Sequence, residues 1–207
     1  MLLIIINLAV FGYEVYLGRY LDEFIFSHAV IPIQLSSVGM TADQLVRLTT
    51  AMFLHGGWFH VLSNMLYLWI FGDNVEDRMG HFRYLVFYLL TGYIATIAHI
   101  FYYPFSNSPL IGASGAIAGI LGAYLILYPR AKVLTLVFLF IFIQIIPIPA
   151  VIFLGLWFVL QILSGVAGLT DQTAQGVAFW AHIGGFIAGI LLVKLFSRSK
   201  DRDYVNY

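Results

Sequence analysis

Long apolar runs recur along this chain of 207 residues, and they constrain its fold more than any other feature. Several of them approach the roughly 20 residues that an α-helix needs to cross about 30 Å of hydrocarbon at about 1.5 Å per residue. Hydrophobic residues make up 61% of the sequence and charged residues only 10%, a composition foreign to soluble globular domains. The sequence therefore predicts an all-α membrane protein that crosses the bilayer several times.

Short polar stretches divide the apolar sequence into six expected spans. They lie near residues 1–18, 58–72, 82–102, 112–128, 147–164 and 177–196. The first lacks the positive n-region and the small-residue cleavage site of a signal peptide, so we interpret it as a membrane helix. The sequence contains no long-period repeat, linker or low-complexity stretch, which predicts a single domain over residues 1–207.

The segment 131–146 decides the topology, because it is apolar enough to cross the membrane once more. With a single crossing between residues 131 and 164, most basic residues fall on one face of the bilayer: Arg78, Arg83, Arg130, Lys132, Lys194, Arg198, Lys200 and Arg202. Only Arg19 and Arg47 fall on the other face. The positive-inside rule then predicts that both termini are cytoplasmic and that 131–146 is an interfacial or re-entrant segment.

Charge and residue content exclude several classes of function. The net charge is zero and the charges are dispersed, so the lipid bilayer, and not nucleic acid, is the expected environment. The chain has no cysteine, which removes disulfides, thiolate metal sites and cysteine nucleophiles. His55, His60 and His182 lack the spacing of a zinc motif, and no acid lies at their depth. Neither a metal nor a cofactor is predicted.

Two polar residues inside expected spans carry the main chemical signal, since polar groups are costly in hydrocarbon. Ser114 lies just inside the outer end of the fourth span, in the run Gly112-Ala113-Ser114-Gly115. His182 lies about 8 Å down the sixth span, which enters from the same side, so the two residues have similar depths. A serine hydroxyl beside an imidazole that accepts its proton makes a nucleophile and its base.

Glycines at helical spacing allow the fourth and sixth spans to approach each other closely. They are Gly115, Gly119 and Gly122 in the fourth span and Gly185 and Gly189 in the sixth. This is the small-xxx-small pattern of contacting membrane helices, and such a contact would bring Ser114 to His182. Glu14 is the only carboxylate within a clear span and is interpreted as a packing residue, while Asp171 lies in a loop. The sequence therefore favours a Ser–His dyad over a triad.

The second span adds a polar patch at the same depth. His60 and Asn64 are four residues apart and therefore share a helix face. Their side-chain N–H groups can point at one oxygen atom, as an oxyanion hole requires, beside a backbone N–H of Ala113 or Ser114. Each signal alone is more often packing than catalysis, but their common depth on three helices favours a catalytic site. The remaining histidines are interpreted as interfacial or loop residues: His28, His81 and His99.

At these residues the chain resembles the rhomboid family of intramembrane proteases. The shared motifs are Gly-Ala-Ser-Gly in the fourth span, Ala-His-x-x-Gly-x-x-x-Gly in the sixth and His-x4-His-x3-Asn in the second. The resemblance covers the six-span core and implies a transmembrane helix bundle of rhomboid type. It implies that Ser114 is the nucleophile and His182 the base, that His60 and Asn64 help to bind the oxyanion, and that His55 supports them.

The same resemblance implies a serine endopeptidase that cuts single-span or other transmembrane proteins in or near the outer part of their membrane helix, through an acyl-enzyme. It suggests a minimal prokaryotic-type member in the cell's inner membrane. Two positions depart from the family pattern. Val46 replaces the tryptophan of a Trp-Arg loop motif, in which Arg47 resembles the arginine. Ala118 lies where some members carry a tyrosine that stacks on the catalytic histidine.

Two other classes of function stay open. One is an inactive rhomboid-like protein that retains a membrane client without cutting it, although the presence of both Ser114 and His182 counts against it. The other is a small transporter or channel, which needs polar residues across the whole bilayer and not at one depth. A protease would need a hydrated cavity open to the outer face, covered by loop residues or by the loop Gly165–Gly176.

Overall fold

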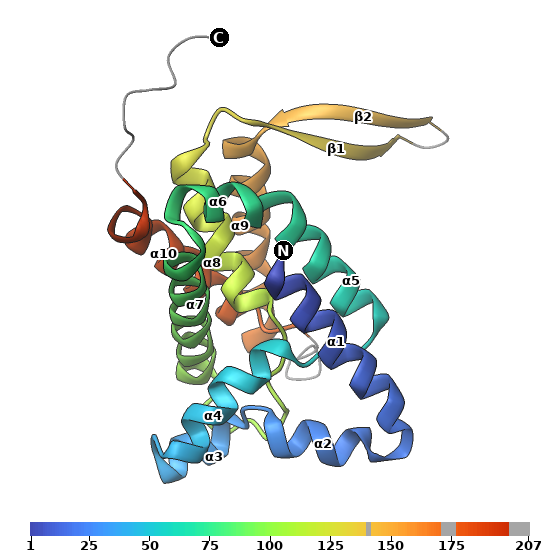
Figure 1. Cartoon of the computed structure of the whole chain (residues 1–207), viewed down its shortest axis with the longest axis vertical. Coiled ribbons are helices and arrows are strands. Elements are labelled where there is room, and N and C mark those ends of the chain that lie inside the picture. The colour runs from blue at the N-terminus through green and yellow to red at the C-terminus, as the bar shows by residue number, and fades with distance from the viewer. Residues whose placement is uncertain (140–141, 171–176, 199–207) are drawn as a thin grey trace.

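The computed structural model of the chain describes residues 1–139, 142–170 and 177–198. Most of these residues form a bundle of helices, and a two-stranded hairpin lies at one end (Figure 1). The helices are α1 (Leu2–Leu17), α2 (Leu21–His28), α3 (Pro32–Val38), α4 (Ala42–Thr50), α5 (Trp58–Tyr67), α6 (Asp73–Met79), α7 (His81–Tyr102), α8 (Ser114–Leu127), α9 (Ala150–Thr170) and α10 (Phe179–Phe196). The strands are β1 (Lys132–Leu139) and β2 (Phe142–Pro149). A π-helical turn, Leu68–Gly72, joins α5 to α6.

Four helical segments are long and apolar enough to cross a membrane. They are Leu2–His28, His81–Tyr102, Ala150–Leu169 and Phe179–Phe196. Large apolar side chains such as Leu191 and Leu195 are exposed, as expected where lipid replaces water. The protein is therefore an integral membrane protein with several spans. Helix α8, with 14 residues, is shorter, so the arrangement of six spans stays a prediction.

Helix α8 is the most deeply buried helix of the bundle. Every residue from Gly115 to Tyr124 is buried, in keeping with a sequence that is apolar on all sides. Helix α10 packs directly against it. A Cβ atom added to Gly185 would collide with the carbonyl oxygen of Gly115, and one added to Gly189 with that of Gly119. The glycine faces of the fourth and sixth spans therefore meet, as the sequence predicts, with their backbones in contact.

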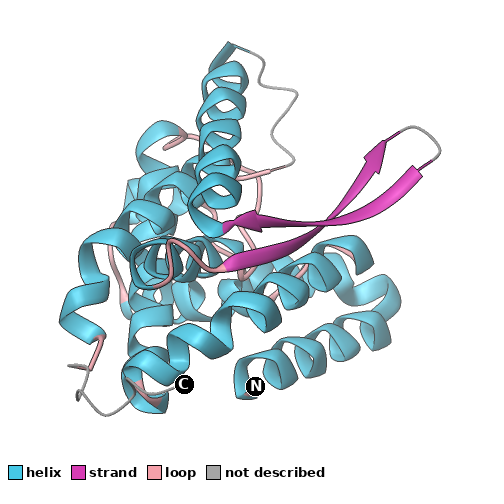
Figure 2. Ribbon diagram, turned by 90° about the horizontal axis from the view of Figure 1, so that it is seen from above, coloured by secondary structure: helices cyan, strands magenta, loops and turns pink. Residues whose placement is uncertain are grey.

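The hairpin is a departure from the all-helical expectation. Strands β1 and β2 pair in antiparallel register from Lys132 with Pro149 to Leu139 with Phe142. They project sideways from the bundle, as the view from above shows clearly (Figure 2). Valine, isoleucine and phenylalanine are typical strand residues, and the prolines at 147 and 149 disfavour a helix. Residues 132–139 and 142–149 therefore form strands, in and just after the segment 131–146 that the sequence analysis predicted to be interfacial or re-entrant.

The helix that follows the hairpin also differs from its expected bounds. Helix α9 begins at Ala150, just after the second of the two prolines, and not at residue 147. It continues to Thr170, so the first part of the expected loop Gly165–Gly176 is helical. Gly165 does not end the helix, because an isolated glycine is tolerated inside a helix. Trp180 and Ile183 of α10 lie next to this position. The rest of that expected loop, 171–176, lies outside the described residues.

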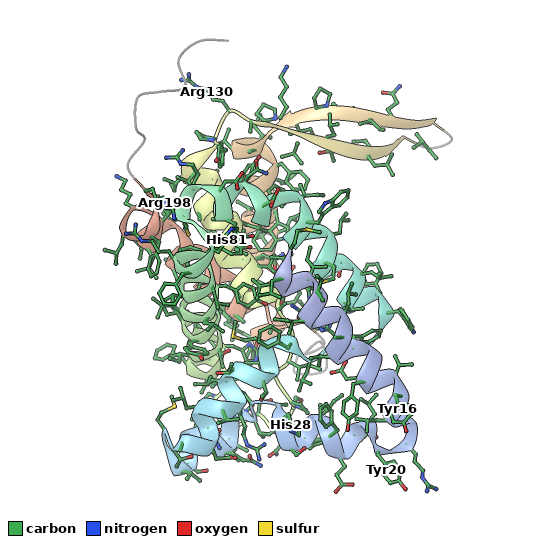
Figure 3. The ribbon with its side chains drawn as sticks, in the orientation of Figure 1. Tyr16, Tyr20, His28, His81, Arg130 and Arg198 are labelled. Atoms are coloured by element: carbon green, nitrogen blue, oxygen red, sulfur yellow. The ribbon has the colours of Figure 1, made fainter. Side chains whose placement is uncertain are left out.

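The first and last described residues lie at the same end of the bundle. The Met1 amine is 3.6 Å from a carboxylate oxygen of Glu76, and the backbone N–H of Arg198 donates to the carbonyl of Arg78 at 2.8 Å. Figure 3 shows Arg130 and Arg198 toward this end and Tyr16, Tyr20 and His28 toward the other. Lys200 and Arg202, two of the basic residues in the topology argument, lie outside the described residues.

Candidate active site

Ser114 is the first residue of α8, and the turn before it sets its position. Gly112 has a φ of 117°, a region that favours glycine, and its N–H donates to the carbonyl of Ala51 at 2.8 Å. The absent Cβ matters as well. A Cβ atom on Gly112 would lie 2.7 Å from Nε2 of His60, so this glycine lets the imidazole pack against the backbone next to the serine.

The structure brings Ser114 and His182 into hydrogen-bonding distance. Nε2 of His182, in the first turn of α10, lies 2.8 Å from Oγ of Ser114. The other ring nitrogen, Nδ1, lies 2.8 Å from Oε1 of Gln161 on α9. An amide oxygen only accepts hydrogen bonds, so Nδ1 carries the hydrogen and Nε2 presents its lone pair to the serine hydroxyl. This arrangement lets the imidazole take the proton of the serine.

His60 and Asn64 line the same cavity as Ser114 and His182. The backbone N–H of Gly56 donates to Nδ1 of His60 at 3.3 Å, so Nε2 of that ring carries a hydrogen. Asn64 is 6% exposed, and its Nδ2 has no hydrogen-bond partner within the part of the chain that the structure describes. The site therefore offers two side-chain N–H donors next to the serine. An unpaired buried donor such as Asn64 Nδ2 is costly in a native fold and points to a ligand oxygen.

His55 belongs to the loop that leads into α5 and is almost fully buried. Its backbone N–H lies 3.0 and 3.3 Å from the two carboxylate oxygens of Glu14, and its Nδ1 lies 3.1 Å from the carbonyl of Phe53. Its ring packs edge-on against that of His60, with 5.0 Å between centroids. Burial and the neighbouring His60 lower the pKa of His55 to about 4, which keeps its imidazole neutral.

Glu14 does more than the packing that the sequence analysis assigned to it. Glu14 is 1% exposed, and its carboxylate holds the backbone of the loop that carries His55 and leads to His60. The sequence signal was present, since an ionisable residue inside a span is a functional hypothesis by default. Its partner was not visible, because the bond joins positions 41 residues apart.

A cavity of about 640 Å³ is lined by Ser114, His182, His60 and Asn64. His99, Tyr103 and Trp180 also line it, together with Gly168 from the last turns of α9. His99, which the sequence analysis interpreted as an interfacial or loop residue, lies within the last turn of α7 and is therefore not a loop residue. Its ring lies 5.2 Å from that of Tyr103 between centroids. Within residues 1–139, 142–170 and 177–198, no three His, Asp or Glu side chains gather in a group that could hold a metal ion.

The sequence analysis missed Gln161. This amide lies in the apolar run of the fifth span and hydrogen-bonds to His182. Trp157, one turn earlier on α9, lies 6.0 Å from the His182 ring between centroids. A polar side chain in an apolar helix is itself a signal, but its partner depends on how α9 is rotated about its axis.

Comparison with known proteins decides the family. Residues 42–199 match the Rhomboid domain family, and this match includes His60, Asn64, Ser114 and His182. The chain belongs to the rhomboid family. This family includes serine proteases, and the name rhomboid protease is carried by two relatives, GluP of Bacillus subtilis and AarA of Providencia stuartii.

Relatives of this rhomboid chain occur in several kinds of organism. It is 27% identical over 157 residues to Rhomboid protein 1, mitochondrial, of Saccharomyces cerevisiae and 30% identical over 169 residues to Rhomboid-like protein 11, chloroplastic, of Arabidopsis thaliana. It is 31% identical over 137 residues to AarA. The yeast alignment covers 73% of this chain and 42% of the relative, and the Arabidopsis alignment covers 74% and 55%. The AarA alignment covers 60% of this chain and 48% of the relative. The chain thus spans about half the length of these curated relatives.

Proposed function

We propose that this protein is an intramembrane serine endopeptidase that cuts transmembrane proteins in or near the outer part of their membrane helix. The observation that carries the proposal is the distance of 2.8 Å between Ser114 Oγ and His182 Nε2, inside a bundle of membrane helices. The cavity beside this pair gives a peptide bond and a water molecule room to reach the serine below the membrane surface.

In the proposed reaction, Ser114 Oγ attacks the scissile carbonyl while His182 Nε2 accepts the hydroxyl proton. The oxyanion that forms is bound by the N–H groups of His60 and Asn64 and by a backbone N–H of Ala113 or Ser114. His182 then gives its proton to the leaving amine, which departs and leaves an acyl-enzyme. A water molecule, deprotonated by His182, attacks the ester carbonyl. The bond from that carbon to Ser114 Oγ then breaks, His182 returns the proton to Oγ, and the new carboxyl terminus of the substrate leaves. The reaction uses no cofactor.

The proposed topology has six spans in a prokaryotic inner membrane, with both termini cytoplasmic. It is supported by the position of Met1 and Arg198 at one end of the bundle and by the basic residues that gather there. The cysteine-free chain allows a direct test. A Ser199→Cys variant should react with a membrane-impermeant maleimide in inverted vesicles only, and reaction in intact cells would reverse the orientation.

The enzyme class is tested by labelling the purified protein with a serine-directed fluorophosphonate in detergent. We expect the wild type to be labelled and to cut a reconstituted single-span substrate. Ser114→Ala should lose both properties, and His182→Ala should lower cleavage by roughly 10⁴-fold or more, because the two residues act as a unit. A wild type that binds the substrate but neither reacts nor cuts would instead be the inactive client-retaining protein.

A further inference from the structure

Gln161 approaches the proposed base from the side opposite Ser114. Its Oε1 lies 2.8 Å from Nδ1 of His182, and Ser114 Oγ lies 2.8 Å from Nε2 of the same ring. The three groups form one continuous line of hydrogen bonds that joins α8, α10 and α9. Gln161 is not among the residues that line the cavity in the described part of the chain, so it reaches the reaction only through His182.

A catalytic imidazole has to satisfy two conditions that the serine alone does not enforce. The hydrogen must sit on Nδ1, because a hydrogen on Nε2 would leave no lone pair for the serine proton. The ring plane must also stay aimed at Oγ. A hydrogen bond from Nδ1 to a fixed acceptor fulfils both conditions, and in soluble serine proteases a buried carboxylate provides it.

An amide suits this position in the membrane better than a carboxylate. A charged group here would pay a large desolvation cost, whereas the neutral amide oxygen accepts the same hydrogen bond. Helix α9 provides the acceptor for Nδ1 of His182. Ala118 of α8 offers no ring to stack on the imidazole, while Trp157 and Phe179 flank it at 6.0 and 6.5 Å between centroids.

We propose that Gln161 is a positioning residue that holds His182 in the tautomer and orientation in which it deprotonates Ser114. The working unit is then a relay of Ser114, His182 and Gln161, and not a dyad. This inference rests on the proposed function. It assigns to α9 a direct role in the chemistry, because the ring of His182 is aimed correctly only while α9 lies against α10.

The competing explanation is that Gln161 is interhelical glue, which stabilises the contact of α9 with α10 without tuning the base. Three substitutions separate the two roles. Gln161→Met keeps the length and approximate volume of the side chain but has no strong acceptor. Gln161→Glu keeps an acceptor oxygen whether or not it is ionised. Leu160→Met is the matched control, because Leu160 is 51% exposed on the adjacent position of the same helix.

The experiment measures kcat, KM and the melting temperature of each variant with a reconstituted single-span substrate. We expect Gln161→Met to lower kcat by about 10- to 10²-fold, less than the roughly 10⁴-fold loss that follows when a soluble protease loses its carboxylate, because a neutral acceptor makes a weaker hydrogen bond. KM should stay within about twofold of the wild type, since Gln161 does not line the cavity. Gln161→Glu should restore kcat to within a few-fold, and Leu160→Met should leave kcat unchanged.

Two results would overturn the inference. The first is a Gln161→Met protein with wild-type kcat. The second is an equal loss of kcat in Gln161→Met and Gln161→Glu with a lowered melting temperature in both. That result is expected if Gln161 only stabilises the contact between α9 and α10. If Gln161→Met does not accumulate, Gln161→Asn takes its place, because a side chain shorter by one methylene cannot reach Nδ1. Failure of the proposed function is separate and visible in the control arm: the wild type and Leu160→Met would then not cut the substrate either.

Discussion

The two walls of the cavity are built in different ways. Ser114 and His182 belong to α8 and α10, whose backbones touch through facing glycines. His60 and Asn64 belong to α5, and the loop before that helix is held by hydrogen bonds from His55 to Glu14 and from Gly56 to His60. The first wall depends on the absence of side chains, while the second depends on a few polar ones.

This difference separates two tasks that a protease must combine. The distance between a nucleophile and its base tolerates little change. A close backbone contact between two helices keeps that distance nearly constant, because tightly packed groups have little room to move. Oxyanion donors need only converge on an oxygen atom that is present during the reaction, and Asn64 Nδ2 accordingly lies unpaired among the described residues. We therefore expect substitutions in the first wall to disturb geometry, and substitutions in the second wall to remove individual interactions.

The largest effect outside the nucleophile and base is expected in the second wall. Asn64→Ala and His60→Ala each remove a donor to the oxyanion, which typically costs roughly 10²–10³-fold in kcat. Ser114 and His182 stay in place in both variants, so labelling by a fluorophosphonate should be slowed but not abolished. The measurement is kcat on a single-span substrate, together with the rate of labelling. An unchanged kcat in both variants would reassign this wall to packing.

The first wall was largely predictable from the sequence. The glycine spacing together with the common depth predicts the approach of Ser114 to His182, which the structure confirms as a distance of 2.8 Å. Its catalytic meaning stays a prediction. These inferences succeed because helical periodicity converts sequence spacing directly into a face and a depth.

The polar contacts around that wall were not predictable in the same way. Gln161 meets His182 and Glu14 meets His55 across different helices, and an apolar sequence does not specify how each helix is rotated. The hairpin β1–β2 was missed for another reason. A long apolar run has neither the period of a helix nor that of a half-buried strand, so periodicity does not distinguish them.

A smaller loss, of about 10²-fold, is expected when the glycine contact of the first wall is broken. Gly185→Leu places a side chain where the carbonyl of Gly115 lies, so α8 and α10 must separate, and a displacement of about 1 Å between reacting groups can cost roughly 10²-fold. The melting temperature in detergent should fall as well. Gly12→Leu on α1 is the matched control, since a Cβ atom there meets nothing within 4 Å. Equal activity and stability in the two variants would show that the glycine contact does not control the distance from Ser114 to His182.

The smallest effect is expected at Glu14, and it sharpens the contrast between the walls. Glu14→Ala leaves the buried N–H of His55 without its acceptor, which costs about 1–3 kcal/mol of stability, so the melting temperature should fall. Turnover should fall less than in Asn64→Ala, by roughly tenfold or less, because His60 keeps its ring and loses only the anchoring of its loop. Glu14→Gln retains one acceptor oxygen and should lie between Glu14→Ala and the wild type in both measurements. The test compares the loss of kcat with the fall in melting temperature. If Glu14→Ala lost as much kcat as Asn64→Ala without a change in melting temperature, Glu14 would take part in the reaction and not merely hold the second wall.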